Sequence, residues 1–333
     1  MKLNTFRRIL SITEVNRTIL LIVISLIIYI LNPFFYTGAN FNLMATWGSV
    51  FALMVIGQML YLIPGGIDLS IGGVICISNV LAALFIIEFG MPMWISVIIV
   101  LALGALIGFT TAVFANTFSP PLRYLLPVFI YTIMLSFVLT GIGRIITGAF
   151  PIYGFPDVYS LIAKARIGPF PIIFIYLLII VGIFTFIFYF KPFGWHLFAI
   201  GLNDEIARKM GINVKRTRLI AFTIGSLIQA FVGIIIGSYL SVGSVLIGPS
   251  YLLPILAGAF IGGISLAGGE GSPFGAVLGG LVVYLIENII VVLAVSAFWK
   301  EVATGLFLFF FVLFDFYQKR RRVFSRTITK TLR

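Results

Sequence analysis

The most regular feature of the chain is a series of long apolar blocks separated by short polar segments. Each block has about 18 to 24 residues, the length of a helix that crosses a hydrocarbon core of about 30 Å. The blocks lack the two-residue alternation of an outer-membrane β-barrel. The pattern therefore predicts an all-α integral membrane protein with about ten transmembrane helices, at residues 19–36, 43–64, 70–88, 93–116, 125–147, 171–190, 219–242, 251–268, 274–295 and 299–318.

One long polar stretch, residues 191–218, lies between two apolar blocks. Its middle is predicted to be a short helix that Asn203 caps and Gly211 ends. Acidic residues occupy the first turn and basic residues the last, which suits the helix dipole and forms two i,i+4 pairs. The pairs are Asp204 with Arg208, and Glu205 with Lys209.

The other side of this short helix is apolar. Ile206, Ala207 and Met210 are predicted to form a small apolar knob, and a helix this short does not fold alone. Two interpretations remain open. The helix lies on the membrane surface as an amphipathic turn, or it docks a soluble partner.

Composition excludes a water-soluble globule. The 333 residues are 61% hydrophobic and 10% charged, with a mean hydropathy of +1.19, whereas soluble domains are about 25% charged. One Cys and one His exclude a disulfide framework and leave little for a metal site. Cys76, inside an apolar run, is interpreted as a packed small residue. Residues 1–17 are basic and polar, so no cleavable signal peptide is expected.

The distribution of positive charge predicts the orientation. With ten spans, both termini and the 191–218 loop share one face, and that face carries 18 of the 22 Lys and Arg residues. By the positive-inside rule this face should be cytoplasmic. Residues 1–318 then form a single transmembrane domain, and the basic tail 319–333 anchors the topology and contacts lipid headgroups rather than nucleic acid. The four cations of the other face are Arg144, Lys164, Arg166 and Lys300.

A helix break is expected where one predicted span ends in the sequence PGGIDLSIGG, residues 64–73. Asp68 brings a carboxylate close to the membrane there. Two roles are open for it. It caps the following helix by accepting a backbone N–H such as that of Ser70, or it contacts a transported solute. The residues that break the helix are Pro64, Gly65 and Gly66.

Further polar groups lie inside the predicted spans. Asn and Gln side chains in membrane helices commonly form hydrogen bonds between helices. Glu287 differs, because an unpaired carboxylate deep in a span is costly and should face a watery cavity or a partner. The candidates for the translocation path, or for breaks in the helices beside it, are Gly65, Gly66, Asp68, Ser70, Asn79, Glu287 and Asn288.

Four spaced sequence blocks together resemble a known family. They are PGGIDLSIGG (64–73), PVFIYTIMLSFVLTGIGRIITG (127–148), FGWHLFAIGLNDEIARKMGINVKRTRLIAF (193–222) and IGGISLAGGEGSPFGAVLGG (261–280). In this order they resemble the permease subunits of ribose- and galactose-type ABC importers, within the branched-chain amino acid and monosaccharide permease superfamily. The likeness covers nearly the whole chain after the first predicted span.

The resemblance implies a type II-like permease of ten helices in a prokaryotic cell membrane. Such a permease pairs as a homodimer or heterodimer, receives solute from an extracytoplasmic binding protein and is driven by cytoplasmic ABC ATPase subunits. ATP and Mg²⁺ would then bind to those partners, and this chain would be a non-catalytic subunit that binds no cofactor. The resemblance makes the 203–216 segment the coupling helix, with contacts from Asn203, Asp204, Glu205, Ile206, Ala207, Met210, Gly211 and Ile212.

The chain also departs from the family's pattern. Leu252 stands where an acidic residue is usual, Pro254 is unexpected, and SPPLRYLLPVF replaces a shorter turn before the fifth span. The solute therefore stays open between a pentose or hexose, a nucleoside, and a sugar-derived signalling molecule such as autoinducer-2. The rival from another class is a secondary transporter that couples to protons through Asp68 or Glu287. An intramembrane enzyme is disfavoured by the scarcity of His, Cys and paired carboxylates.

Overall fold

The structure is a computed structural model that describes residues 37–118 and 125–292, together with isolated residues outside these ranges. Within this part of the chain the molecule is a helical bundle with two very small sheets. Among the described residues, seven helices are long and apolar enough to cross a membrane. They are α3 (Gly38–Leu62), α4 (Ile71–Ala83) with its π-helical continuation η2 (Leu84–Glu88), α5 (Met93–Phe118), α6 (Leu125–Thr147), α8 (Ile172–Phe190), α11 (Val214–Leu240) and α13 (Pro273–Val292).

Each of these seven helices lies within about five residues of a predicted span, so hydropathy located them well. The first and tenth predicted spans, 19–36 and 299–318, and the basic tail 319–333 fall outside the continuously described ranges.

The predicted span at 251–268 is wrong. The chain forms only the short helix α12 (Leu252–Ile261) there, preceded by the single 3₁₀ turn η3 (Pro249–Tyr251). Ten residues rise about 15 Å, half of the hydrocarbon thickness. Pro254 lies in the first turn of α12, where a missing N–H costs nothing. Gly262 and Gly263 follow the helix, and Gly263 has φ of +73°, so the chain turns there instead of continuing the helix that the apolar composition suggested.

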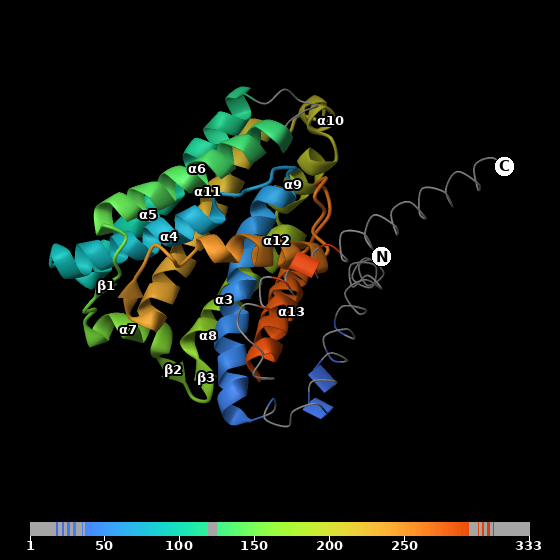
Figure 1. The fold of residues 1–333 in the computed structure, drawn as a ribbon. Helices are drawn as coiled ribbons and strands as arrows, with labels where there is room; N and C mark the ends of the chain where they lie inside the picture. Colours follow the sequence, from blue (N-terminus) through green and yellow to red (C-terminus); the bar gives the residue numbers. More distant parts are fainter. Residues whose placement is uncertain are drawn as a thin grey trace.

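The small elements lie at the two ends of the bundle (Figure 1). At one end are α7 (Asp157–Lys164) and two antiparallel sheets, one pairing β1 (Ile152–Tyr153) with β4 (Val242–Gly243), the other pairing β2 (Arg166–Ile167) with β3 (Phe170–Pro171). At the opposite end are α9 (Pro192–Leu202) and α10 (Asp204–Lys209).

The α9 helix was not predicted, because its residues were counted in the polar stretch 191–218, of which only the middle was interpreted as a helix. Lys191 has extended backbone angles, and Pro192 then opens a new helix at its first position. Likewise, α11 begins at Val214 rather than at residue 219. Its first turn is charged, and hydropathy marks only the part of a helix that sits in lipid.

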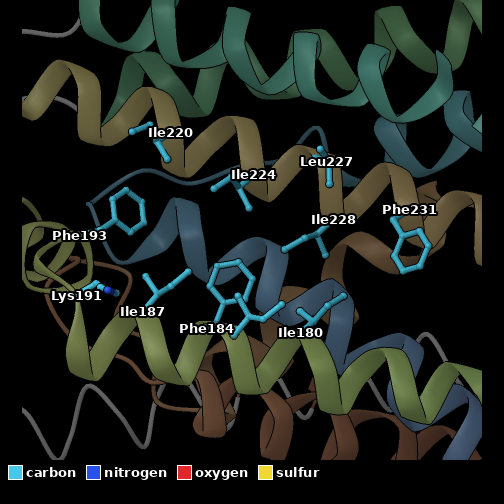
Figure 2. A pocket seen from close by; sticks show the side chains of 11 residues that line it. Ile180, Phe184, Ile187, Lys191, Phe193, Ile220, Ile224, Leu227, Ile228 and Phe231 are labelled. Carbon is cyan, nitrogen blue, oxygen red and sulfur yellow. The ribbon is translucent and has the colours of Figure 1, made fainter. Parts of the chain in front are cut away.

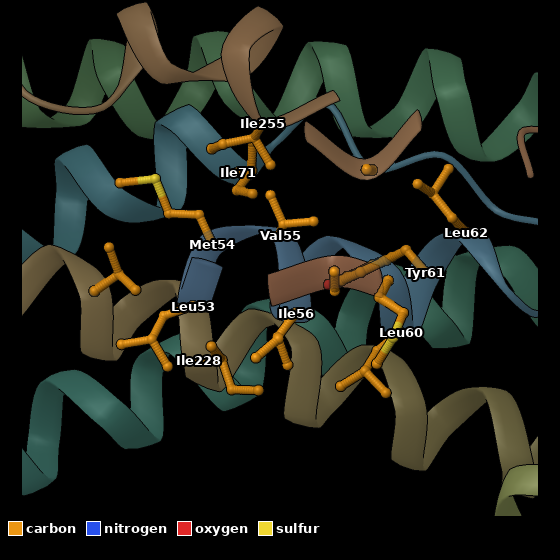
Figure 3. Packing of buried hydrophobic residues seen from close by; sticks show 14 of the residues in the cluster. Leu53, Met54, Val55, Ile56, Leu60, Tyr61, Leu62, Ile71, Ile228 and Ile255 are labelled. Atoms are coloured by element: carbon orange, nitrogen blue, oxygen red, sulfur yellow. The ribbon is translucent and has the colours of Figure 1, made fainter. Parts of the chain in front are cut away.

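The core is centred on α3 and α11. The most apolar stretches of these two helices are 78% and 67% buried, and that of α4 with η2 is 72% buried, against 22–28% for α5, α6 and α8, so these last three helices carry much of the exposed apolar surface. Figure 3 shows the α3 side chains from Leu53 to Leu62 packed between the neighbouring helices. Tyr61 stacks on Phe222 with ring centroids 4.3 Å apart and donates its hydroxyl to the Phe222 carbonyl. Small residues let helices of the core pack closely. For example, a Cβ on Gly233 of α11 would lie 2.6 Å from the Ile75 carbonyl of α4.

Candidate functional site

The α9–α10 segment has the capping geometry that its sequence predicts. The Asn203 side-chain oxygen accepts the backbone N–H groups of Glu205 and Ile206, each at 3.0 Å. Gly211, just past the helix, has φ of +83°, a conformation that favours glycine. Both predicted ion pairs form, Arg208 with Asp204 at 3.2 Å and Lys209 with Glu205 at 2.9 Å. The hydrogen bond from Lys209 and its positive charge lower the pKa of Glu205.

The predicted apolar knob does not form as one surface. Ala207 is buried, 2% exposed, in a small cluster with Ile200 and Val214, and Ile212 packs against that cluster. Ile206 and Met210 instead point outward, 55% and 75% exposed. The helix is only six residues long, and its contact with α9 and α11 decides which side is covered. We call the outward-facing side chains Leu202, Ile206 and Met210 the α10 patch.

A buried ion pair fixes this segment to the bundle. The Asp204 carboxylate is 6% exposed and accepts Arg218 of α11 at 3.3 Å, and Arg218 is 2% exposed. Sequence reasoning treated Arg218 only as one more cytoplasmic cation. Its position one turn inside α11, near the start of the apolar block, is the signal that it serves a fixed partner, since an arginine there rarely stays buried without one. Asp204 therefore holds α10 in place rather than facing outward.

Glycines join the α9–α10 segment to two loops of the bundle. The Gly269 N–H donates to the Ile63 carbonyl at 2.8 Å. A Cβ on Gly201 would collide with both Ile63 O and Gly269 N, and one on Gly268 would lie 2.9 Å from the Cα of Gly65. Backbone thus meets backbone at four glycines, which we call the glycine junction: Gly65, Gly201, Gly268 and Gly269. The junction connects α9, the end of α3 and the loop before α13.

The predicted helix break begins at this junction. Residues 63–70 are not helical, and Gly65 has φ of +84°. Gly66 donates its N–H back to the Tyr61 carbonyl at 2.9 Å. The chain then runs back beside α3 until Asp68 lies level with Gln58 and with Gln229, which is near the middle of α11. Non-helical backbone at this depth persists because protein surrounds it.

Asp68 is fully buried and held by neutral groups. Its Oδ1 accepts the Ser70 N–H at 2.7 Å and the Ser70 hydroxyl at 2.5 Å, and its Oδ2 accepts the Gln229 amide at 3.1 Å. The Gln58 amide donates to the Asp68 carbonyl at 3.1 Å. The predicted hydrogen bond from the Ser70 N–H is therefore present, but Asp68 does not cap α4, whose N-cap residue is Ser70 and has no side-chain cap. We call Gln58, Asp68, Ser70 and Gln229 the polar node.

Thr132 of α6 is the member of this region that the sequence did not reveal. Its hydroxyl accepts the Leu69 N–H at 3.0 Å and donates to the Ile67 carbonyl at 3.3 Å. A single Thr in an apolar helix carries no distinguishing signal, since most bond their own helix.

The other predicted path residues lie apart from the polar node. Asn79 binds the β4 region, donating to the Val242 carbonyl and accepting the Ser244 N–H at 2.7 Å. Asn288 exchanges two amide hydrogen bonds with Asn40 of α3. Glu287, 9% exposed, interacts electrostatically with Tyr251 and Tyr284. The asparagines thus act as contacts between elements, and the structure does not gather the predicted polar residues into one site.

Comparison with known proteins identifies the family. The model of the family described as "Branched-chain amino acid transport system / permease component" matches residues 40–313. The chain belongs to this family. This permease is therefore a transport subunit and a multi-pass protein of the bacterial inner membrane.

Curated relatives cover nearly the whole permease. It is 29% identical to the ribose import permease protein RbsC of Haemophilus influenzae over 91% of this chain and 93% of the relative. It is 31% identical to a probable ABC transporter permease protein of Sinorhizobium fredii over 85% of this chain and 83% of the relative. It is 27% identical to the xylose transport system permease protein XylH of Haemophilus influenzae over 86% and 91%. No solved structure matches.

Proposed function

We propose that this permease forms the membrane path of an ATP-driven importer for a monosaccharide or a sugar-like solute. The names of the ribose and xylose import permeases support the solute class, and both relatives align over most of their length. The pentose, hexose, nucleoside and autoinducer-2 alternatives stay within this proposal. A second permease copy or homologue and an extracytoplasmic binding protein complete the assembly that we propose.

The observation that carries the proposal is the construction of the α9–α10 segment. The α10 patch is apolar and exposed, and it lies at one end of the bundle beside charged side chains of the same short helix. The same segment is fixed from behind by the Asp204–Arg218 pair and touches the end of α3 through the glycine junction. A force on the patch therefore has a rigid route to the helix break.

The charges of the two ends support a cytoplasmic position for this segment. Residues 191–218 carry six Lys and Arg residues. The opposite end of the described part carries Arg144, Lys164 and Arg166, and Lys164 donates to Ser241 there. By the positive-inside rule the α9–α10 end is cytoplasmic. In this proposal ABC ATPase subunits cover the α10 patch and bind ATP and Mg²⁺, while this chain binds no cofactor.

The mechanism follows from the contacts. When the ATPase subunits close, they move α10, and the buried Asp204–Arg218 pair keeps α10 and α11 moving together. The glycine junction passes the displacement to residues 63–70, where the polar node is the internal support. Such a bundle needs two packed arrangements of similar free energy.

The test is substitution of one exposed apolar residue at each end. Ile206→Glu places a charge in the α10 patch, and Leu161→Glu places one on α7, where Leu161 is 57% exposed, close to the 55% of Ile206. With the permease expressed beside its ATPase subunits, Ile206→Glu should abolish ATPase co-purification and solute uptake, and Leu161→Glu should leave co-purification intact. Equal co-purification for both variants contradicts the proposal. Uptake in ATPase-free liposomes driven by a proton gradient would favour the secondary transporter instead.

A further inference from the structure

An apolar groove of about 450 Å³ lies between the halves of α8 and α11 that are nearest to α9. Figure 2 shows it with Lys191 at one end and Phe231 at the other, and with the side chains of both helices pointing into it. Apart from Lys191, every residue that lines it is Ile, Leu or Phe. The groove lies on neither the α10 patch nor the polar node, so the proposed transport mechanism does not use it.

The length of the groove matches one leaflet of a bilayer. From Lys191 to Ile180 the α8 helix advances eleven residues, or about 16 Å. One half of the hydrocarbon core is about 15 Å thick. The groove therefore runs from the membrane surface at Lys191 to about the middle of the bilayer at Ile180 and Phe231.

The position of the groove favours a flexible chain over a helix as the occupant. A helix with its side chains is about 10 Å wide, and it would have to enter between α8 and α11, whose side chains line the groove from both sides. A single hydrocarbon chain is narrower than a helix and lies between two helices without separating them. At this depth a lipid acyl chain is also the apolar material always present.

The charge at the surface end favours an anionic headgroup. Lys191 lines one end of the groove, and its ammonium lies 5.2 Å from the centroid of the Phe186 ring on the last turns of α8. Within the described ranges 37–118 and 125–292, no acidic residue lines the groove. Trp195, 59% exposed on the first turns of α9, is close in sequence, and Trp with Lys at one level is typical of a membrane interface.

We propose that this groove holds one acyl chain of an anionic phospholipid, whose phosphate is bound by Lys191. The lipid fills the space between α8 and α11 beside the α9–α10 segment and so stabilises the helix pair that leads into it. The proposal depends on the residues that line the groove, on the length of the groove and on the charge of Lys191. It holds for either orientation of the protein in the membrane.

The test is native mass spectrometry of the purified full-length permease, exchanged into an equal mixture of phosphatidylglycerol and phosphatidylcholine. The wild type should keep one lipid, enriched about fivefold in phosphatidylglycerol, since one Lys near a membrane surface contributes about that factor. Lys191→Gln should keep a lipid but lose the enrichment, and Lys191→Arg should retain it.

A matched pair of substitutions tests the groove itself. Ile183 lines the groove and is 51% exposed, whereas Ile130 on α6 is 47% exposed and lies outside it. Ile183→Trp should remove the retained lipid, and Ile130→Trp should keep it, with both variants monodisperse by size exclusion. If Ile183→Trp fails to fold, Leu227→Trp on the facing helix replaces it. The proposal is overturned if the wild type keeps no selected lipid, if the two Ile variants behave alike, or if Ile183→Trp breaks a permease dimer without changing lipid content.

Discussion

Two buried aspartates of this permease are held by opposite means. Asp204, at the α9–α10 end of the bundle, is paired with the guanidinium groups of Arg208 and Arg218. Asp68, near the middle of the bundle, receives only neutral donors, from Ser70 and Gln229. Asp204 can leave its arginine partners only by burying an unpaired charge, whereas a carboxylate held by hydroxyl and amide groups can accept another neutral donor in place of one that it gives up. We infer that the Asp204–Arg218 pair is a stiff attachment at the end where the ATPase subunits are proposed to bind. The hydrogen bonds around Asp68 are, by contrast, an adjustable support at the helix break.

The largest expected effect is the loss of Arg218. Removing one member of a buried ion pair costs about 3–5 kcal/mol, whereas removing an exposed member costs about 0–1 kcal/mol. Arg218→Met should therefore release α10, and Arg208→Met, at a position 41% exposed, should not. Release of α10 would expose Ala207, which is 2% exposed, and the rate of maleimide labelling of Ala207→Cys in detergent measures that exposure. The native Cys76 is buried and should contribute little to the labelling. Labelling at least tenfold faster in Arg218→Met is expected, and equal labelling in both variants would contradict the stiff attachment.

The second effect concerns the glycine junction that connects the two regions. A methyl group at Gly201 collides with the backbone of Ile63 and Gly269, which cannot turn aside as a side chain would. Gly201→Ala should lose about 1–3 kcal/mol of stability or more, together with uptake. Gly182→Ala on α8 is the control, since a Cβ there meets nothing within 4 Å. Thermal unfolding measures the stability of the two variants, and solute uptake measures their transport. Normal uptake by Gly201→Ala would show that the junction transmits no motion.

A third effect separates charge from hydrogen bonding at Asp68. Asp68→Ala leaves the Ser70 N–H and the Gln229 amide without acceptors, at about 1–3 kcal/mol each. Asp68→Asn should lose only about 1 kcal/mol. Its Oδ1 still accepts from Ser70, and the Gln229 amide can flip to offer Oε1, which has no hydrogen-bond partner within the described residues. Thermal unfolding distinguishes the two. If Asp68→Asn is as damaging as Asp68→Ala, the negative charge itself is required and the adjustable support is wrong.

A fourth effect is expected at Gly211, after α10. A Cβ there meets nothing within 4 Å, so only the positive φ opposes substitution. Gly211→Val should cost about 1–3 kcal/mol of backbone strain, because a β-branched residue rarely adopts this conformation. We expect it to uncouple ATP hydrolysis from uptake while membrane insertion stays normal. Gly211→Asn, which tolerates the left-handed region, should remain coupled. Coupled uptake by Gly211→Val would remove the turn from the mechanism.

Patterns local in sequence gave correct predictions. Hydropathy located seven long helices, and the short α10 helix was predicted with its cap, its two ion pairs and its terminal glycine. The break after α3 followed from consecutive Pro and Gly residues. The same composition misled at 251–268, because an apolar run does not reveal that the chain folds back after ten helical residues.

Contacts between distant residues could not be predicted. Nothing in a single sequence pairs Asp204 with Arg218 or brings Gly269 against Ile63, because packing rather than local preference decides these partners. The outward and inward sides of α10 were misassigned for the same reason. Ala207 is buried because α9 and α11 cover it, and those neighbours are invisible to periodicity.

The most direct test of the account is photo-crosslinking from a benzophenone side chain at Ile206 in intact membranes that contain the whole transporter. The account predicts an adduct with the ATPase subunit from Ile206, which is 55% exposed in the α10 patch, and none from Leu161 at the opposite end. An adduct with the extracytoplasmic binding protein from Ile206, or labelling of Ile206→Cys by a reagent confined to the outside, would place the segment on the wrong face and contradict the account.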